Sequence, residues 1–266
     1  MSAKRKMLEH LDMFWEGRCD FTIPQAGSSK DALHIFKKNI VPITWHCLST
    51  FEHNPATLPQ TETILKGQSV SGMSIDALMQ VKRYGDGANL LISMIADGSF
   101  ALDAKTACAL HNHVGHEEAL TWGQFRDRLV TIANVQYTPP DGALLSDIAT
   151  KGFTFLASEI TAPQERAMAA FLFMSRTQFF HDANKRTASL VMNGVLMREG
   201  FHPVTIMNHN SEEFHTKLSD FYNTGNATRM MHFFGRTVKE LYSAQERSGP
   251  QQPGTQARQR LRKRTR

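Results

Sequence analysis

Apolar residues recur every three or four positions along most of the chain, a spacing typical of helices that bury one face. This spacing predicts seven helical segments, at 73–98, 103–115, 143–157, about 167–175, about 184–199, 210–222 and 226–244. A Gly-Asp-Gly at 85–87 is expected to break the first of these. The chain is therefore expected to be mainly α-helical.

Two segments depart from the helical spacing. Residues 125–137 alternate apolar and polar positions, with Val130 and Ile132 as strand-like residues, and Pro-Pro-Asp-Gly follows. We interpret this segment as a short β-hairpin, or flap. Residues 54–62 contain two prolines and several polar residues, which favour a loop. The predicted fold class is thus a mainly α helical bundle with a short β-hairpin flap.

The composition is ordinary for a globular protein, with 41% of the 266 residues hydrophobic and 21% charged. The longest apolar run, Ala167–Met174, has about eight residues, far below the roughly 18 needed to span a bilayer. No apolar stretch follows the basic N-terminus, so we expect no signal peptide. Three scattered cysteines lack metal-ligand spacing and suit reduced thiols. A cytoplasmic protein without a membrane segment is expected.

The net charge of +5 is concentrated at the C-terminus. Beyond Arg247 there are six basic residues and no acidic one, and they account for more than the whole net charge. The segment 246–266 is also rich in Gln, Pro and Gly, which predicts a disordered basic tail. A nucleic-acid partner is therefore not expected, except through this tail.

The stretch Phe-Phe-His-Asp-Ala-Asn-Lys-Arg-Thr-Ala at 179–188 carries the most chemistry. It lies between two predicted helices. Asp182 can hold a cation, and the backbone N–H groups of 183–185, at the start of the second helix, can face an anion. Arg186 lies one turn into that helix. An acid, a backbone anion site and an arginine on one turn suit the Mg²⁺ and the phosphates of a nucleotide.

Two predicted helices joined by a short loop of this sequence resemble a Fic (Fido) domain. The motif of that family reads His, any, Phe, any, Asp or Glu, Gly or Ala, Asn, Gly or Lys, Arg. Alignment on Asn184 places the acid of the motif at Asp182, its small residue at Ala183, its Lys at Lys185 and its Arg at Arg186. The Phe of the motif falls on Phe180. The resemblance covers 55–245, which we expect to be a Fic-like domain after an N-terminal arm with helices at 1–54.

The resemblance implies the transfer of AMP from ATP to a Ser, Thr or Tyr hydroxyl of a target protein. Asp182 would hold Mg²⁺, the amides of Ala183, Asn184 and Lys185 would bind the phosphates, and Arg186 would neutralise charge on the leaving pyrophosphate. These four nucleotide-binding residues and this metal ligand are the predicted site. A flap at 128–137 would clamp an extended segment of the target protein.

The catalytic His of the family falls on Gln178. A carboxamide does not titrate near neutral pH and does not accept the proton of an attacking hydroxyl. Loss of a general base costs roughly 10²–10⁴-fold in rate. The chain is therefore either a weakened or altered transferase, or a nucleotide-binding pseudoenzyme. Whether it is an active enzyme stays open.

A second departure concerns the transferred group. Lys185 stands where AMP-transferring members often have Gly, and Ser189 stands where they often have a second Arg. The string Ala-Asn-Lys-Arg-Thr-Ala resembles the Doc branch, which transfers phosphate in toxin–antitoxin systems. A Doc-like phosphotransferase is the third hypothesis, and a homodimer or an antitoxin partner stays open.

Three nearby features have competing interpretations. His181 is a candidate replacement base, but we favour a solvent-facing side chain at the variable position of the motif. His111, His113, His116 and Glu117 resemble metal ligands, but their spacing favours a solvated helix end. Family members often carry an inhibitory Glu, and the best matching segment, 61–67, has Lys66 there. We expect no glutamate over the phosphate site.

Overall fold

The computed structural model describes residues 2–17 and 20–248, which form eleven α-helices and two 3-10 turns. The first helices are α1 (Ala3–Leu11), α2 (Ser29–Lys38), α3 (Ile40–Glu52), α4 (Leu58–Leu65), α5 (Ile75–Ala96) and α6 (Ala104–Val114). They are followed by η1 (Gly142–Leu144), α7 (Leu145–Glu159), α8 (Pro163–Thr177), α9 (Asn184–Arg198), η2 (Asn208–Asn210), α10 (Ser211–Thr224) and α11 (Thr228–Ser248). The mainly helical prediction is confirmed, while most of the predicted basic tail, from 249 onward, lies outside the described residues.

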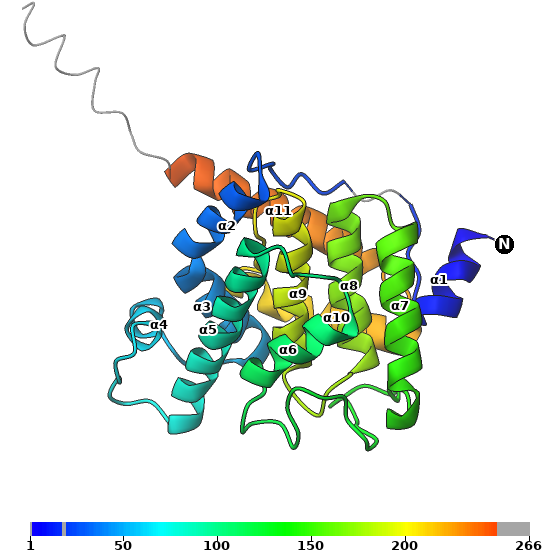
Figure 1. The fold of residues 1–266 in the computed structure, drawn as a ribbon, viewed down its shortest axis with the longest axis horizontal. Coiled ribbons are helices and arrows are strands. Elements are labelled where there is room, and N and C mark those ends of the chain that lie inside the picture. Colours follow the sequence, from blue (N-terminus) through cyan, green and yellow to red (C-terminus); the bar gives the residue numbers. More distant parts are fainter. Residues whose placement is uncertain (1, 18–19, 249–266) are drawn as a thin grey trace, which may run out of the picture.

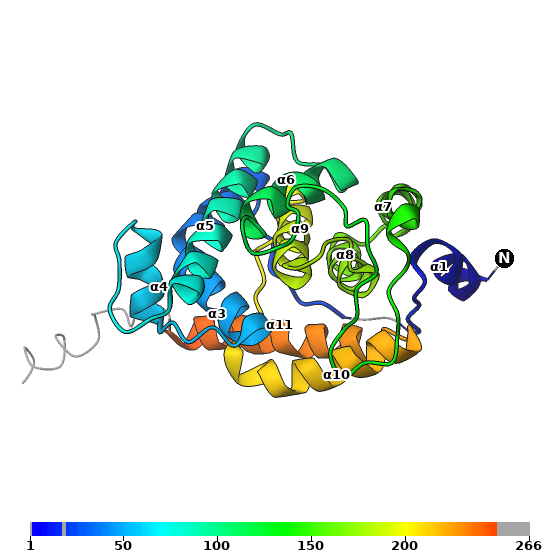
Figure 2. The same cartoon turned by 90° about the horizontal axis from the view of Figure 1, so that it is seen from below.

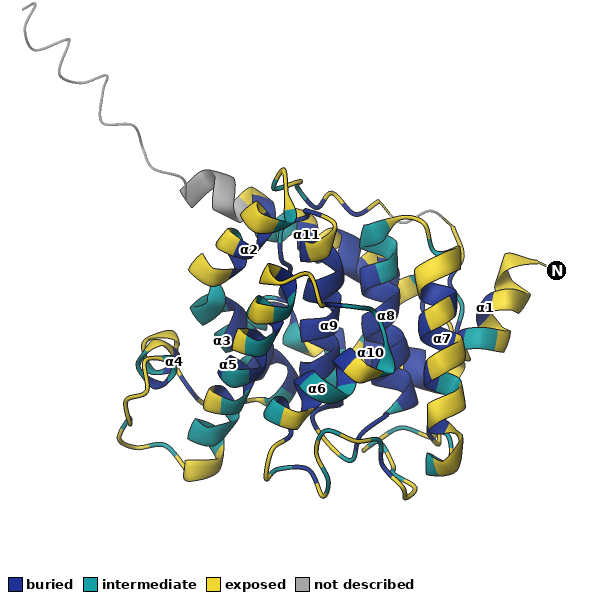
Figure 3. Ribbon diagram, in the orientation of Figure 1, coloured by how far each residue is buried: buried dark blue, intermediate teal, exposed yellow. Residues whose placement is uncertain are grey.

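Two neighbouring helices, α8 and α9, form the centre of the bundle (Figure 1). Every residue of α8 from Ala167 to Thr177 is buried, and α9 is nearly as enclosed (Figure 3). A helix buried on all sides has to satisfy its polar side chains internally. Asn193 does so, because its amide binds the backbone of Val204 and the carbonyl of Ser189. The loop between these two helices is therefore held at both ends by the core.

The other helices surround this pair. Helices α3, α5 and α6 contact α9 on one side, and α7 contacts α8 on the other (Figure 1). Helices α10 and α11 pack against each other and run across one face of the bundle, where α11 contacts α8 (Figure 2). In the described residues, no helix combines the length and apolar character needed to cross a membrane.

Helix α5 is continuous, so the expected break at 85–87 is wrong. Both glycines serve close packing there. A Cβ at Gly85 would lie 2.4 Å from the Leu65 side chain, and one at Gly87 would lie 2.6 Å from Val114. A glycine inside a helix costs about 1 kcal/mol relative to alanine. At these two positions the missing side chain allows the neighbouring helices to pack closely.

The loop expected over 54–62 is also partly wrong, because α4 begins at Leu58. Thr57 and Gln60 form a capping box, in which each side chain binds the backbone of the other residue. Pro59 lies in the first turn, where its missing N–H removes no helical hydrogen bond. The proline that looked like a loop signal therefore belongs to a helix start.

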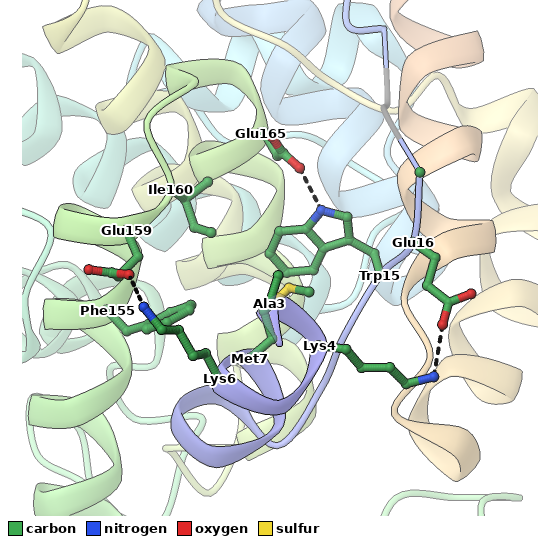
Figure 4. A pocket seen from close by; sticks show the side chains of 11 residues that line it. Ala3, Lys4, Lys6, Met7, Trp15, Glu16, Phe155, Glu159, Ile160 and Glu165 are labelled. Carbon is green, nitrogen blue, oxygen red and sulfur yellow. Dashed lines mark hydrogen bonds and ion pairs between the residues drawn. The ribbon is translucent and has the colours of Figure 1, made fainter. Parts of the chain in front are cut away.

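The N-terminal arm docks on α7 and α8 (Figure 4). The buried Trp15 donates an indole hydrogen bond to Glu165 at 2.5 Å, and Lys6 pairs with Glu159 on α7 at 3.0 Å. A cavity of about 630 Å³ lies between this arm and the end of α7. Lys4 pairs with Glu16, so the charged side chains drawn around the cavity all have partners within the protein.

Candidate active site

The motif loop begins with a residue that closes α8. Gln178 adopts a left-handed conformation (φ 51°) and its N–H donates to the carbonyl of Met174. Its carboxamide donates to the carbonyl of Ser175 at 2.6 Å and accepts from the Asn184 amide at 3.0 Å. Asn184 also exchanges two hydrogen bonds with the backbone of Phe180. The side chain at the position of the family base is thus a structural link across the loop.

The start of α9 keeps part of the expected anion site. Ala183 has a left-handed conformation (φ 58°), and no side chain among the described residues caps the helix. The first helical hydrogen bond runs from Thr187 to the Ala183 carbonyl, so the N–H groups of the first turn face outward from the helix. One of the three predicted amides, that of Ala183, donates to Oδ1 of Asp182 at 2.5 Å. The amides of Asn184 and Lys185 are those left for an anion.

Arg186 is fully buried and surrounded by carboxylates. It makes a bidentate pair with Glu118, with both N–O distances at 2.7 Å. Its Nε lies 3.2 Å from Glu52 and one Nη lies 3.3 Å from Asp182. Burial alone would lower the pKa of this guanidinium, but Glu118, Glu52 and Asp182 outweigh it and raise the pKa. Three negative groups thus surround the predicted phosphate-binding arginine.

This arrangement contradicts the expectation that no glutamate would lie over the phosphate site. The carboxylates come from the end of α3 and from the turns after α6, and not from the segment 61–67. Lys66 is exposed and pairs with Glu62 on the same helix. Burial opposes ionisation of Glu118, yet Arg186 keeps its pKa below the usual value. Glu118 is therefore held as a charged partner of Arg186.

The position of the missing second arginine is filled by other side chains. The Ser189 hydroxyl lies 3.3 Å from the hydroxyl of Tyr84 and 3.9 Å from the thiol of Cys47. Tyr84 is fully buried, and burial raises the pKa of the Cys47 thiol to about 12. Lys185 is half-buried, and its Nζ lies 4.0 Å from Glu52. Lys185 is thus the other cation beside the Arg186 cluster on this turn.

Sequence reasoning missed the role of His111, which is fully buried rather than solvated. Its ring stacks on Phe180 with a centroid distance of 3.8 Å and an angle of 5°. The Gly123 amide donates to Nδ1, which leaves the proton on Nε2, 3.2 Å from the Asp182 carbonyl. Burial lowers the pKa of His111 to about 4. A neutral histidine therefore positions the backbone of Asp182.

The sequence did contain a signal for this burial. Ala107, Leu110, His111 and Val114 occupy the apolar stripe of α6, and all four are buried. The histidine thus lies on the inner face of the helix. No cluster of three or more metal-ligating side chains occurs in the part of the chain that the structure describes.

We expected His181 to face solvent, but it does not. Its side chain is only 10% exposed, and its Nε2 lies 3.4 Å from Oδ1 of Asp127. Among the described residues, this buried Nε2 has no partner in hydrogen-bond geometry. Asp127 is 75% exposed and belongs to the segment between α6 and α7.

That segment carries the predicted flap, but the structure assigns no strand to residues 125–137, so the β-hairpin is not confirmed. The reason lies in its hydrogen bonds. The buried guanidinium of Arg126 donates to the carbonyls of Gln178, Arg128 and Pro140. At the other end, two backbone amides at 136–137 donate to the Asn223 side chain. Most of these partners lie outside the segment, and they hold it in a conformation without strand pairing.

A cavity of about 490 Å³ opens beside the Arg186 cluster. Glu52 and Glu118, which bind Arg186, line it together with His53, Gln80, Arg83 and Glu117. The charged groups of the cluster therefore border a space large enough for a small molecule.

Asp182 suits a magnesium ion of the kind bound with phosphates. Its side chain is 54% exposed beside the uncapped start of α9. Mg²⁺ in phosphate-transfer sites is held by one or two carboxylates together with substrate oxygens and water, so a cage of protein ligands is not required.

Comparison with known proteins shows what the segment around this site is similar to. Residues 101–196 match the model of the Fic/DOC family. The chain is similar to the protein adenylyltransferase Fic of Aedes aegypti, with 25% identity over 222 residues, 80% of this chain and 44% of that protein. It is similar to the protein of the same name from Drosophila yakuba, with 32% identity over 158 residues, 58% of this chain and 32% of that protein. A Fic family protein from Desulfovibrio desulfuricans has the same fold, with a TM-score of 0.64 and 15% identity over 86% of this chain and 78% of that one.

These matches define a Fic-fold protein. The segment 101–196, which matches the Fic/DOC family model, contains the motif loop. The chain spans about half or less of the length of the curated relatives it matches.

Proposed function

We propose that this protein binds ATP with Mg²⁺ at the start of α9 and transfers AMP to a Ser, Thr or Tyr hydroxyl of a target protein. The observation that carries this proposal is the placement of Asp182, the uncapped amides of 184–185 and Arg186 on one turn. Relatives named protein adenylyltransferase support it. The proposed setting is the cytoplasm.

Each residue has a defined task in this proposal. The amides of Asn184 and Lys185 bind phosphate oxygens, with the helix N-terminus favouring negative charge. Asp182 holds Mg²⁺, which supplies charge neutralisation between the phosphates when bound. Arg186 stabilises the charge of the leaving pyrophosphate. His111 fixes the Asp182 backbone, because it bonds to that carbonyl.

Nucleotide binding in this form requires exchange at Arg186. The guanidinium already binds Glu118 and Glu52, so phosphate oxygens have to replace at least one carboxylate. Phosphate and carboxylate groups are both anionic acceptors that form bidentate pairs with a guanidinium, so the exchange conserves the hydrogen bonds of Arg186.

The target is proposed to lie over the segment 128–137. Leu129 is 65% exposed there, and Leu120 and Trp122 in the same connection are 61% and 38% exposed. All three belong to the connection between α6 and α7, in which Arg126 binds the Gln178 carbonyl. The partner is proposed to be a protein segment, since exposed apolar side chains suit a protein contact.

Labelled ATP and a cell lysate test the proposal. Wild type, Gln178→His and Asp182→Ala are incubated with ATP labelled at the α-phosphate, and proteins are separated. Label from wild type that is lost in Asp182→Ala supports AMP transfer. Label only after Gln178→His favours the pseudoenzyme, a candidate supported by the internal bonding of the Gln178 carboxamide.

The same experiment with ATP labelled at the γ-phosphate tests Doc-like phosphotransfer. This candidate rests on Lys185 and on the space at Ser189, which Tyr84 and Cys47 fill. Transfer of γ-label without α-label would establish it, and an antitoxin partner would then be sought.

A further inference from the structure

The guanidinium of Arg83 on α5 is largely buried and makes few hydrogen bonds. The side chain is 11% exposed, and its Nη2 donates to Glu117 at 3.2 Å. Its Nε is buried and has no acceptor among the described residues. A guanidinium carries five N–H donors, and a buried donor without an acceptor costs free energy. Arg83 is therefore suited to bind a second carboxylate.

Glu118 is the carboxylate that lies beside this guanidinium. It directly follows Glu117, and both line the cavity of about 490 Å³ that Arg83 also lines. Gln80, about one turn before Arg83 on α5, donates to Oε1 of Glu118 at 3.1 Å, and the same oxygen binds Arg186. Burial raises the pKa of Glu118, but Arg186 outweighs it, and Gln80 and Arg83 lower that pKa further. Glu118 thus lies between α5 and α9.

Nucleotide binding at Arg186 would displace this carboxylate. Glu118 forms the bidentate pair with Arg186, and the proposed function requires phosphate oxygens to replace a carboxylate there. The Glu118 side chain is only 24% exposed, so a displaced carboxylate without another cation would be a largely buried, unpaired charge, which is costly. Glu117 reaches Arg83 from the adjacent position of the same turn. A carboxylate on this turn is therefore able to bind Arg83.

We propose that Arg83 is a positioning residue that binds the Glu118 carboxylate when the phosphates of ATP replace it on Arg186. This inference rests on the proposed binding of ATP and adds a residue to it. Glu118 exchanges one arginine for another, so no buried carboxylate is left without a cation. Glu117 is 60% exposed, and it gives up Arg83 at little cost because exposed ion pairs contribute little. Arginines on two contacting helices, α5 and α9, thus serve as alternative partners of one glutamate.

A double-mutant cycle between Arg83 and Glu118 tests this inference, with ATP affinity measured by calorimetry in the presence of Mg²⁺. Arg83→Met should bind ATP about tenfold more weakly than wild type, because the displaced Glu118 then has no second cation. In the Glu118→Gln background the same change should leave ATP affinity within about twofold, because a neutral amide needs no cation. Lys82→Met is the matched control on the same helix. Lys82 is exposed and pairs with Asp86, so this variant should bind ATP like wild type.

A second variant separates the role of the cation from that of the fold. Arg83→Lys keeps the positive charge, so it should bind ATP more tightly than Arg83→Met. Denaturant unfolding shows whether each variant folds. If Arg83→Met does not fold, the cycle is run with Arg83→Lys, which should lose less affinity than about tenfold, and only where Glu118 is present.

The other outcomes overturn the inference in distinguishable ways. Equal weakening by Arg83→Met with and without the Glu118 carboxylate would show that Arg83 acts on ATP or on the fold, and not through Glu118. Wild-type affinity in Arg83→Met would show that Glu118 needs no second arginine, although the nucleotide site would stand. Absence of ATP binding by both wild type and Glu118→Gln would contradict the proposed function, and the role of Arg83 with it.

Discussion

The two ends of the motif loop differ in what their side chains are free to do. At Gln178 the carboxamide bonds to Ser175 and Asn184 inside the protein. At Arg186 the guanidinium bonds to carboxylates that border a cavity. The bonds of Gln178 join groups within the protein. At Arg186, by contrast, a phosphate of a bound nucleotide could replace a carboxylate. We therefore interpret Gln178 as a structural residue and propose that the partners of Arg186 can exchange.

The largest effect is expected from Arg186→Met. This change removes a fully buried guanidinium and leaves the largely buried Glu52 and Glu118 without their common partner, so we expect a loss of about 3–5 kcal/mol in unfolding free energy. Denaturant unfolding measures it. Arg229→Met is the control, because its pair with Asp220 is exposed and should contribute little. Equal losses in both variants would contradict the special role of the cluster.

The other end of the loop is tested by Gln178→Leu. It removes two internal hydrogen bonds and leaves their partners unsatisfied, which should cost about 1–3 kcal/mol of stability. Because the carboxamide does not contact the phosphate site in this account, ATP affinity should stay within about twofold. A large loss of affinity with unchanged stability would show that Gln178 serves the ligand instead.

A pH measurement examines His111 between the two ends. Its folded pKa of about 4 lies below the unfolded value, so the unfolded chain binds the proton first as the pH falls. The stability contribution is complete above about 6.5 and is lost progressively toward pH 4. Between pH 6.5 and 5, we expect wild type to lose about 1–2 kcal/mol more than His111→Gln. Parallel pH curves for the two proteins would refute this.

Glu118→Gln sharpens the idea of an exchangeable site. It weakens the bidentate pair on Arg186, so we expect ATP to bind about tenfold more tightly, since less competition has to be overcome. Glu117→Gln is the neighbouring control, because Glu117 is 60% exposed and pairs with Arg83. Unchanged or weaker binding in Glu118→Gln would mean that Glu118 does not compete with phosphate.

The spacing of apolar residues predicted most of the helices, but local sequence signals were a poorer guide to the segments between them. The helices around the motif follow from their apolar stripes, and the motif loop was located from its own residues. Pro59 was misread, because its effect depends on its place in the first turn. The β-hairpin flap is not confirmed, and the backbone amides at 136–137 bond to the Asn223 side chain.

The site was harder to predict, because its partners are distant in sequence. Glu52 and Glu118 lie 134 and 68 positions from Arg186, and no local pattern joins them. The contact of His181 with Asp127 has the same origin. The assignments of Asp182, Ala183, Asn184, Lys185 and Arg186 as ligand-binding residues, and the boundaries 1–54 and 55–245, stay predictions.

The central claim is that the first turn of α9 binds the triphosphate of ATP. Calorimetric titration with ATP, in the presence and absence of Mg²⁺, tests it most directly. Wild type should give a saturable heat of binding that depends on Mg²⁺. Asp182→Ala should bind ATP at least about tenfold more weakly. The absence of any saturable heat from wild type, or the same affinity in both proteins with and without Mg²⁺, would contradict the account.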